Sequence, residues 1–510
     1  MRASKIIPVE KAVDLIKDND TIVVCGCENL LLAEKVLKAI EERFVKTGHP
    51  KNLAEMHPVT YGMGDGVGLE HFAHEGLLKR SMGSGFSYLK TSNMARMVRE
   101  NKIEAYVMPM GTVYRIIQNV ASGEAYTLTD VGLNTFVDPR IEGGCMNGAT
   151  PNTLAEVIRF KDKELLCYQN PKIDIAIIRG TTADEDGNLS LEEEPLNLGI
   201  AAMAMAAKAC RGKVIAQVKR VAKRGSIHPR SVIVPGIMVD AVVVDEEQYF
   251  SGGAKLNPAL TGEIRMPMGQ IPFLPLDIHK VITRRAADEI AAPPQTVNLG
   301  VGIPTGVPVI LVEEDRLDGI TFFPEHGSLG GVPGERSIFG TNINPDAIID
   351  PTQVFQSFRG GGLDITFLGC GQIDLDGNVN VSKFNGIVPG CGGFIDITYK
   401  TKNVVFCGPF STGGADIRVE DGKIRIYREG KYLKFVPRVE QITLNGQQAL
   451  KKGQRVVYVT ERGVFFLQED GIHLKEIAPG IDAEKDILSH IPFEIIVDRD
   501  LKVMDKKYFE

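Results

Sequence analysis

One carboxylate stands where an enzyme with an α/β fold could use it. Glu325 lies in the segment FFPEHGSLGG at 322–331, where a run predicted to be a strand ends at Pro324 and a loop poor in bulky side chains follows. Sheets of the α/β class place their active sites at the carboxyl ends of their strands. Taken alone, the segment fits an exposed glutamate in a turn better than a nucleophile, so the chemistry needs support from other segments.

Two glycine-rich turns give that support. They read SFRGGGLD at 357–364 and VPGCGGFID at 388–396, and each lies beside a predicted strand. Adjacent glycines let backbone N–H groups approach an oxyanion or a phosphate with no Cβ in the way. Together with Glu325, these turns indicate a site that holds an oxyanion or a phosphate near a carboxylate.

Other motifs are weaker. His71 and His74 in HFAHEG lack a third and a fourth ligand at metal-site spacing, so a structural role fits them better and we predict no metal site. The segment GMGDGVG at 62–68 matches neither the dinucleotide fingerprint nor the P-loop, and a flexible loop is the better interpretation. The chain has no Gly-x-Ser-x-Gly elbow and no HExxH, which argues against serine hydrolases of that type and the commonest zinc peptidases.

The strands and turns expected to position the candidate site residues belong to a segment that occurs twice in the chain. DIAIIRGTTADEDGNL at 174–189 returns as DITFLGCGQIDLDGNV at 364–379, and each copy reads as strand, turn and strand. The chain therefore contains two related halves. A ligand cleft is expected where they meet, because interfaces between domains commonly form such clefts.

Each half alternates strands and helices. A strand at 20–26 precedes a helix at 33–44, and an apolar segment at 199–210 predicts a buried helix. The second half repeats the order with a helix at 282–290 and a strand, turn and helix at 296–311. The pattern predicts an α/β fold of two open sheets with helices on their faces. We place the first domain at 1–255, a linker rich in proline and glycine at 256–276, and the second domain at 277–510.

Composition excludes several classes of protein. The chain has 510 residues, of which 43% are hydrophobic and 24% charged, as in an ordinary globular protein. A net charge of −7 without charged blocks gives no reason to expect nucleic acid or an anionic membrane as partner, and the basic segment at 211–224 reads as a strand. Eight cysteines without a CxxC pair, no apolar signal core and no run of membrane-spanning length predict a soluble, reduced, cytoplasmic protein.

The ordered motifs resemble a known family. The second half carries NLGVGIPTG, PEHGSLGGVPG, GGGLDITFLG, GCGGFIDIT and VTERGVFFL, and the first half carries ERFVKTGHPKNL and TFVDPRIEGG. In this order they resemble a class I coenzyme A-transferase of the single-chain acetate/propionate type, also described as acyl-CoA:acetate/3-ketoacid transferases, over nearly the whole chain. The resemblance implies two related open α/β domains with the active site at their interface, and a homo-oligomer.

The resemblance also implies a mechanism. Glu325 matches the glutamate of the family's E-x-G-x-x-G loop, which is the nucleophile of a ping-pong reaction between an acyl-CoA and a free carboxylic acid. The carboxylate would form a mixed anhydride and then a glutamyl-CoA thioester. CoA is then a substrate, and no metal or redox cofactor is expected.

Further roles follow by match to family motifs. The backbone N–H groups of Gly393 and Phe394 are expected to stabilise an oxyanion, and Gly392 is expected to allow close approach. CoA contacts are expected from the loops GGGLD and DGNVNVSKF, with Asn378 and Lys383 as the candidate residues.

Departures from the family fall in the half expected to hold the acyl group. Where relatives have a glycine-rich loop, this chain reads VCGCENLLLAEK at 24–35, with Glu28 and Asn29. Met110 stands where relatives have the glutamine of Pro-Gln-Gly, and Asn134 stands where glycine is usual. These changes predict an altered acyl pocket for a longer, unsaturated or aromatic acid.

His326 directly follows the nucleophile and is also assigned to the acyl pocket. The sequence leaves three roles open for its ring: a hydrogen bond to Glu325, contact with substrate, or packing.

Three alternatives stay open at this point. An acyl-CoA hydrolase of the same family would pass the glutamyl-bound group to water. A CoA-binding sensor or pseudoenzyme would explain the lost glutamine but not the retained Glu325 and glycine turns. A sugar-phosphate isomerase shares the general sheet topology, but an acid/base set suited to an aldose is missing from the sequence.

Overall fold

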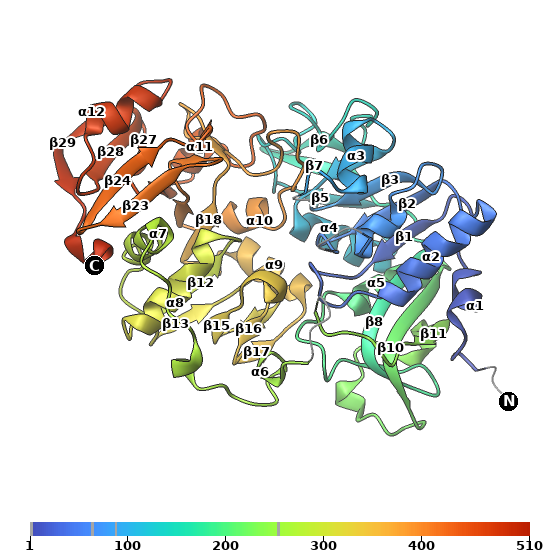
Figure 1. Cartoon of the computed structure of the whole chain (residues 1–510). Coiled ribbons are helices and arrows are strands. Elements are labelled where there is room, and N and C mark those ends of the chain that lie inside the picture. Colours follow the sequence, from blue (N-terminus) through green and yellow to red (C-terminus); the bar gives the residue numbers. More distant parts are fainter. Residues whose placement is uncertain (1–3, 63–65, 87–88, 252–255) are drawn as a thin grey trace.

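Two sheets, each with its own helices, lie side by side in the computed structural model (Figure 1). The structure describes residues 4–62, 66–86, 89–251 and 256–510. The predicted end of the first domain at 255 and the central residues 63–65 of the segment at 62–68 lie outside the described residues.

The first sheet is parallel along its main path, since every neighbouring pair runs in the same direction. Its spatial order is β11 (Ala241–Val244), β10 (Lys213–Ala222), β8 (Ile175–Asp184), β1 (Thr21–Val24), β2 (Leu53–His57), β3 (Leu78–Gly83) and β4 (Glu104–Val107), with the short β9 (Leu189–Ser190) antiparallel to β8. A separate antiparallel sheet contains β5 (Tyr126–Thr129), β7 (Lys163–Gln169) and β6 (Ala155–Phe160).

The second sheet begins with the same parallel arrangement, continues through two antiparallel pairings and ends with a strand that is parallel to its neighbour. Its spatial order is β13 (Ile320–Phe322), β12 (Gln295–Leu299), β18 (Ile365–Gly369), β21 (Asn403–Cys407), β26 (Arg455–Val459), β27 (Gly463–Gln468), β28 (Gly471–Ile477) and β29 (Ile496–Val503). Strands β11, β10, β8, β1 and β2 of the first half occupy the same order as β26, β21, β18, β12 and β13 of the second. The internal repeat is therefore a repeat of sheet topology.

The two Asp-x-Asp-Gly-Asn turns have the same hydrogen bonds. The carboxylate of Asp184 accepts bonds from the backbone and side-chain nitrogens of Asn188, and Asp374 does the same with Asn378. The side-chain oxygen of each asparagine accepts a backbone N–H, from Gly236 in the first half and from Gly446 in the second. Asn378 is thus fully engaged in holding its turn.

The predicted helices form with small shifts at their ends. The described helices of more than seven residues are α2 (Glu34–Thr47), α4 (Met110–Ala121), α5 (Ile200–Ala209), α7 (Ile278–Ala287), α8 (Gly306–Glu313) and α9 (Pro351–Gly360). Helix α5 packs against β8, β10 and α4, which confirms the buried helix predicted at 199–210, although Met205 is 40% exposed. The predicted linker at 256–276 contains the short helix α6 (Pro258–Thr261) and no strand.

The two halves share one core. Their buried apolar side chains form a continuous cluster, and α4 of the first half packs against α9 and α10 (Phe394–Thr398) of the second (Figure 1). An apolar interface of this kind fixes the relative position of the halves. Among the described residues, no helix is long and apolar enough to cross a membrane.

Candidate active site

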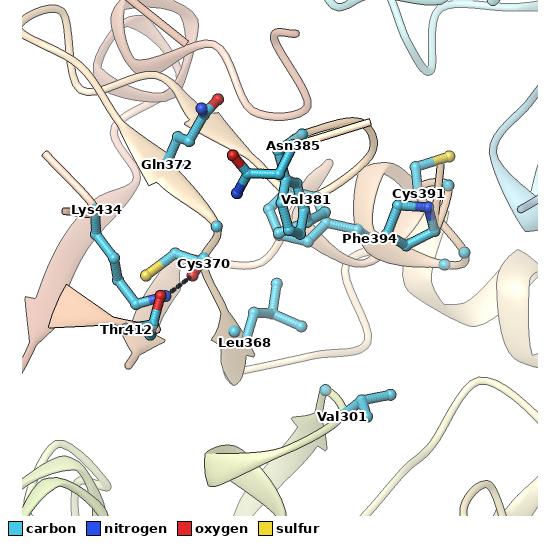
Figure 2. Close-up of a pocket in the computed structure, with 18 of the residues that line it drawn as sticks. Val301, Leu368, Cys370, Gln372, Val381, Asn385, Cys391, Phe394, Thr412 and Lys434 are labelled. Carbon is cyan, nitrogen blue, oxygen red and sulfur yellow. Dashed lines mark hydrogen bonds between the residues drawn. The ribbon is translucent and has the colours of Figure 1, made fainter. Parts of the chain in front are cut away.

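A cavity of about 810 Å³ lies between the halves. The first half contributes five of its lining residues: Glu28, Val59, Thr60, Ser84 and Met110. The rest come from the second half. In Figure 2, Cys391 and Phe394 lie on one side of the space, and Thr412 and Lys434 lie on the other.

Glu325 lines this cavity and is 6% exposed. It follows β13 at the carboxyl end of that strand, as the sequence predicts. The side-chain nitrogen of Asn298 on β12 lies 3.1 Å from Oε2 of Glu325 and donates to it. The hydroxyl of Thr366 on β18 donates to Oδ1 of Asn298, which fixes the direction of the amide. Among the described residues, Oε1 of Glu325 has no hydrogen-bond partner, so that oxygen is free to react.

The glycine turn at 388–396 packs directly against this carboxylate. A Cβ added to Gly393 would lie 3.3 Å from Cγ of Glu325, which leaves little room for any side chain there. The N–H of Gly393 has no hydrogen-bond partner among the described residues, whereas the N–H of Phe394 donates to the carbonyl of Cys391. Of the two predicted oxyanion donors, only the N–H of Gly393 is unoccupied in this arrangement.

Backbone contacts join the two halves at this turn. The N–H of Gly392 donates to the carbonyl of Ser84, and the carbonyl of Gly392 accepts the N–H of Met110. Gly85 approaches so closely that a Cβ there would lie 1.9 Å from the carbonyl oxygen of Pro389. These main-chain hydrogen bonds therefore fix the first-half wall of the cavity relative to Glu325.

A buried ion pair of His57 with Glu55 holds the backbone carbonyl of Gly85 in place. His57 is fully buried, with Nδ1 3.0 Å from the carboxylate of Glu55 and Nε2 2.8 Å from the carbonyl of Gly85. Since both ring nitrogens face acceptors, both must carry a proton. Burial alone lowers the pKa of His57, but Glu55 outweighs it and the pKa is raised overall. The imidazolium holds the Gly85 carbonyl in place.

Several predicted residues lie away from the cavity. The GGGLD turn follows α9, where Gly361 adopts φ +92° at the helix end, and it leads into the amino end of β18 rather than the carboxyl end. Asn378 holds the turn described above, and Nζ of Lys383 donates to the carbonyl of Met146 in the first half. The structure therefore removes these residues from the cavity lining, although their neighbours Val381, Phe384 and Asn385 line it.

Some of the predicted acyl-pocket residues line the cavity, and others lie away from it. Met110 lines the cavity, and so does His326, which is 2% exposed. The ring of His326 lies edge-on to Phe339, and its Nδ1 is buried without a hydrogen-bond partner among the described residues, so no bond joins it to Glu325. Asn29 does not line the cavity. Asn134 adopts φ +63° and accepts a bond from Asn445 across the interface, also outside the cavity.

Glu28 is the second carboxyl in the cavity lining. Its backbone adopts φ +52° and is tied on both sides, by its N–H to the carbonyl of Thr60 and by its carbonyl to the N–H of Gly62. Its carboxyl makes no hydrogen bond to any described residue. Burial raises the pKa of Glu28 to about 7.

That pKa predicts an unusual dependence of stability on pH. The folded protein holds the proton of Glu28 up to about pH 7, whereas the unfolded chain releases it near 4.5, so stability is lost as the pH rises between these values. We expect Glu28→Gln to unfold like the wild type near pH 4 and to be more stable by about 3 kcal/mol at pH 8.

Urea unfolding at a series of pH values measures this difference. The exposed Glu124→Gln serves as a matched control and should show little difference at any pH. A Glu28→Gln effect that is the same at pH 4 and pH 8 would contradict the burial of this carboxyl.

Asn298 is a site residue that the sequence interpretation missed. It lies within the quoted motif NLGVG, and the available signal was an amide inside an otherwise apolar strand, which is costly to bury without a partner. At the equivalent place in β1 the first half has Val23.

We expect Asn298→Ala to lower kcat about 100-fold with little change in KM, because the amide is needed at the reacting carboxylate and not for binding. Thr366→Val, which removes only the hydroxyl that orients Asn298, should lower kcat less. Steady-state kinetics of both variants measure this, and a change confined to KM would assign Asn298 to substrate binding instead.

The first half carries an ion pair at the equivalent location, beside a smaller cavity of about 350 Å³. The repeat aligns Arg179 with Gly369, which lines the cavity. The guanidinium of Arg179 donates to both carboxylate oxygens of Glu194 and to the carbonyls of Leu32 and Tyr249. A buried ion pair thus stands in the first half where the second half has a glycine.

The two histidines considered as metal ligands belong to another ion-pair network. His71 lies between the carboxylates of Glu34 and Glu41, and His74 contacts Glu41. In the part of the chain that the structure describes, no group of three or more His, Cys, Asp or Glu side chains could hold a metal ion.

Comparison with known proteins identifies the family. The coenzyme A transferase family model matches residues 7–245. Acetate CoA-transferase YdiF of Escherichia coli is 37% identical over 508 residues, which cover 99% of this chain and 95% of YdiF. Caffeate CoA-transferase of Acetobacterium woodii is 40% identical over 521 residues, with 99% and 97% covered.

Solved structures agree. The crystal structure of the YdiF apoenzyme from Escherichia coli O157:H7 superposes with a TM-score of 0.94 at 36% identity, over 99% of this chain and 96% of that one. A structure of YdiF in a thioester complex with CoA gives a TM-score of 0.93 at 35% identity, with the same coverage. The resemblance found in the sequence is confirmed: this chain belongs to the coenzyme A transferase family and is a CoA-transferase.

Proposed function

We propose that the enzyme moves CoA from an acyl-CoA to a free carboxylic acid through a thioester on Glu325. One observation carries the proposal: a buried carboxylate in the wall of a large cavity has one oxygen held by Asn298 and the other without a partner among the described residues. Such a carboxylate can act as a nucleophile. The thioester complex of YdiF with CoA supports the same intermediate here.

The proposed steps need no metal or redox cofactor, because every bond that forms is matched by a bond that breaks. Oε1 of Glu325 attacks the thioester carbonyl, a C–O bond forms, the C–S bond breaks, and CoA leaves as a thiolate. The thiolate then attacks Cδ of Glu325 in the mixed anhydride, and the first acid leaves as a carboxylate that retains the former Oε1. The second acid reverses these steps, so each intermediate is an activated carboxyl group and little free energy is lost.

Two groups are suited to the oxyanions that form. The unoccupied N–H of Gly393 lies beside Glu325 and can donate to the oxyanion of the acyl group. Asn298 already donates to Oε2, the oxygen that becomes negative when the thiolate attacks Cδ. A preorganised donor of this kind is worth about 3 kcal/mol in the transition state.

The second-half wall of the cavity suits CoA. It includes Leu368 and Gln372, and it carries the two lysines Lys431 and Lys434. Figure 2 shows Lys434 donating to the carbonyl of Cys370, so this lysine is fixed in position. We place the pantetheine along the middle of this wall and the phosphates toward the lysines.

The first-half wall suits an acid other than acetate. Met110 is unbranched and adaptable, and it lies beside Val59 and the polar residues Thr60, Ser84 and Glu28. The similarity to a caffeate CoA-transferase supports a larger or substituted acyl group.

Intact mass spectrometry tests the proposal. The protein is mixed with a panel of acyl-CoAs and no acceptor acid, and the product is mapped by peptide. We expect a mass increase of one CoA less one water on the peptide containing Glu325, and no increase in Glu325→Ala. Free thiol released continuously without an acceptor would indicate a hydrolase, and CoA binding without an adduct would contradict the proposed mechanism.

A further inference from the structure

The first-half wall of the cavity holds two polar groups that no protein group satisfies. The carboxyl of Glu28, which is half-buried, makes no hydrogen bond to any described residue, and the hydroxyl of Ser84 is fully buried without a partner among the same residues. Buried polar groups in proteins are nearly always paired, and exceptions call for an explanation. Both groups line the cavity, so a bound molecule can supply the missing partner.

Both groups are held rigidly. The backbone of Glu28 is tied to Thr60 and Gly62, and it keeps a positive φ that a glutamate rarely adopts. Ser84 is held through its carbonyl by Gly392 of the facing half. A substrate group therefore meets these side chains at fixed positions, which is what discrimination between similar acids requires.

The surroundings of Glu28 contain no neutralising partner. The other ionisable side chains that line the cavity are those of Glu325, His326, Lys431, Lys434, His490, the phenol of Tyr432 and the thiols of Cys370 and Cys391. None of the described cations forms an ion pair with Glu28. The carboxyls of Glu28 and Glu325 line the same cavity. A second negative charge on a substrate would meet repulsion there.

We propose that Glu28 and Ser84 form a polar acyl subsite that selects monocarboxylic acids bearing a hydroxyl group and disfavours acids with a second carboxylate. A substrate hydroxyl can donate to the carboxyl of Glu28 and accept from the hydroxyl of Ser84. An alkyl group leaves both groups unpaired. This inference rests on the proposed function, since it concerns the acid that Glu325 activates.

The test compares acceptor acids of equal chain length. With a fixed acyl-CoA donor at pH 8, kcat/KM is measured for butyrate, for 2-, 3- and 4-hydroxybutyrate, and for succinate. We expect at least one hydroxybutyrate to exceed butyrate about tenfold or more, because a site built around unpaired polar groups rejects the analogue that cannot pair with them. Succinate should be the poorest acceptor.

Variants separate the subsite from general structural effects. Glu28→Gln should bring the ratio of the preferred hydroxybutyrate to butyrate near one and improve succinate, and Ser84→Ala should lower the ratio partly. Glu124→Gln, on the exposed surface of the same half, should leave all ratios unchanged.

The wild-type ratio of hydroxybutyrate to butyrate should also rise between pH 6 and pH 8 as Glu28 ionises, and this rise should be absent in Glu28→Gln. If Glu28→Gln folds poorly, Glu28→Asp, which keeps the charge and withdraws it by one methylene, should lower the ratio of hydroxybutyrate to butyrate, and an unchanged ratio would overturn the role of Glu28.

Failure of this inference is distinguishable from failure of the proposed function. Equal use of butyrate and all hydroxybutyrates, an unchanged ratio in Glu28→Gln, or transfer to none of these acids would overturn the subsite while the thioester on Glu325 still formed. Absence of that thioester would overturn the mechanism itself.

Discussion

Replacing Glu325 with glutamine is expected to lower kcat/KM for CoA transfer by about 10⁴-fold or more, because an amide cannot form the anhydride or the thioester. Glutamine keeps nearly the same shape, so the fold and the contact with Gly393 should persist. Glu325→Asp keeps a carboxylate but withdraws it by one methylene from the reacting carbon, and a loss of about 100-fold is expected from misplacement alone.

Initial rates with saturating acyl-CoA and acid measure both variants. Glu335→Gln is a matched control in the same segment, since Glu335 accepts a bond from Thr305 and does not line the cavity. It should retain activity within a few fold. A Glu325→Gln variant that keeps more than a hundredth of the wild-type rate after correction for deamidation would exclude Glu325 as the covalent carrier.

The second large effect is on stability. We expect Glu194→Ala to lower the free energy of unfolding by about 3–5 kcal/mol, because it leaves the guanidinium of Arg179 buried and charged without its carboxylate. The two side chains are only 3% and 2% exposed. Arginine cannot escape this cost by releasing its proton.

A double replacement tests that explanation. Arg179→Met combined with Glu194→Leu removes both charges and fills similar volume, so it should lose much less stability than Glu194→Ala alone. Urea unfolding followed by circular dichroism compares the three proteins. Equal losses in the single and double variants would mean that packing, and not the unpaired charge, sets the cost.

Arg179 and Gly369 distinguish the two copies of the duplicated unit, and of the two only Gly369 lines the large cavity between the halves. Both residues occupy the same place in the repeat, which is the middle of β8 in the first half and the end of β18 in the second. Glycine leaves room for a ligand there, whereas arginine pairs with Glu194, joins distant segments of the first half and lines a smaller cavity. One copy of the unit thus provides the nucleophile and the other provides the facing wall.

Local patterns in the sequence were sufficient for much of the site. Glu325 after a strand and the glycines at 390–393 are signals carried by neighbouring residues, and the structure places both at the cavity. The similar turn at 360–362 was misleading because glycine also ends helices, and here it ends α9. Spacing alone cannot distinguish a glycine that opens a binding site from a glycine that ends a helix.

The sequence by itself determined the repeat, the alternation of strands and helices, the buried helix at 199–210 and the candidate carboxylate Glu325, because each depends on periodicity or on a short motif. Only the tertiary structure decided which groups meet that carboxylate. Asn298, Gly393 and Glu325 come from three separate segments, and Asn378 is occupied by its own turn. Whether a buried polar group such as the hydroxyl of Ser84 finds a protein partner depends on distant segments that the local pattern does not specify, and that difference separates a structural residue from one left for the substrate.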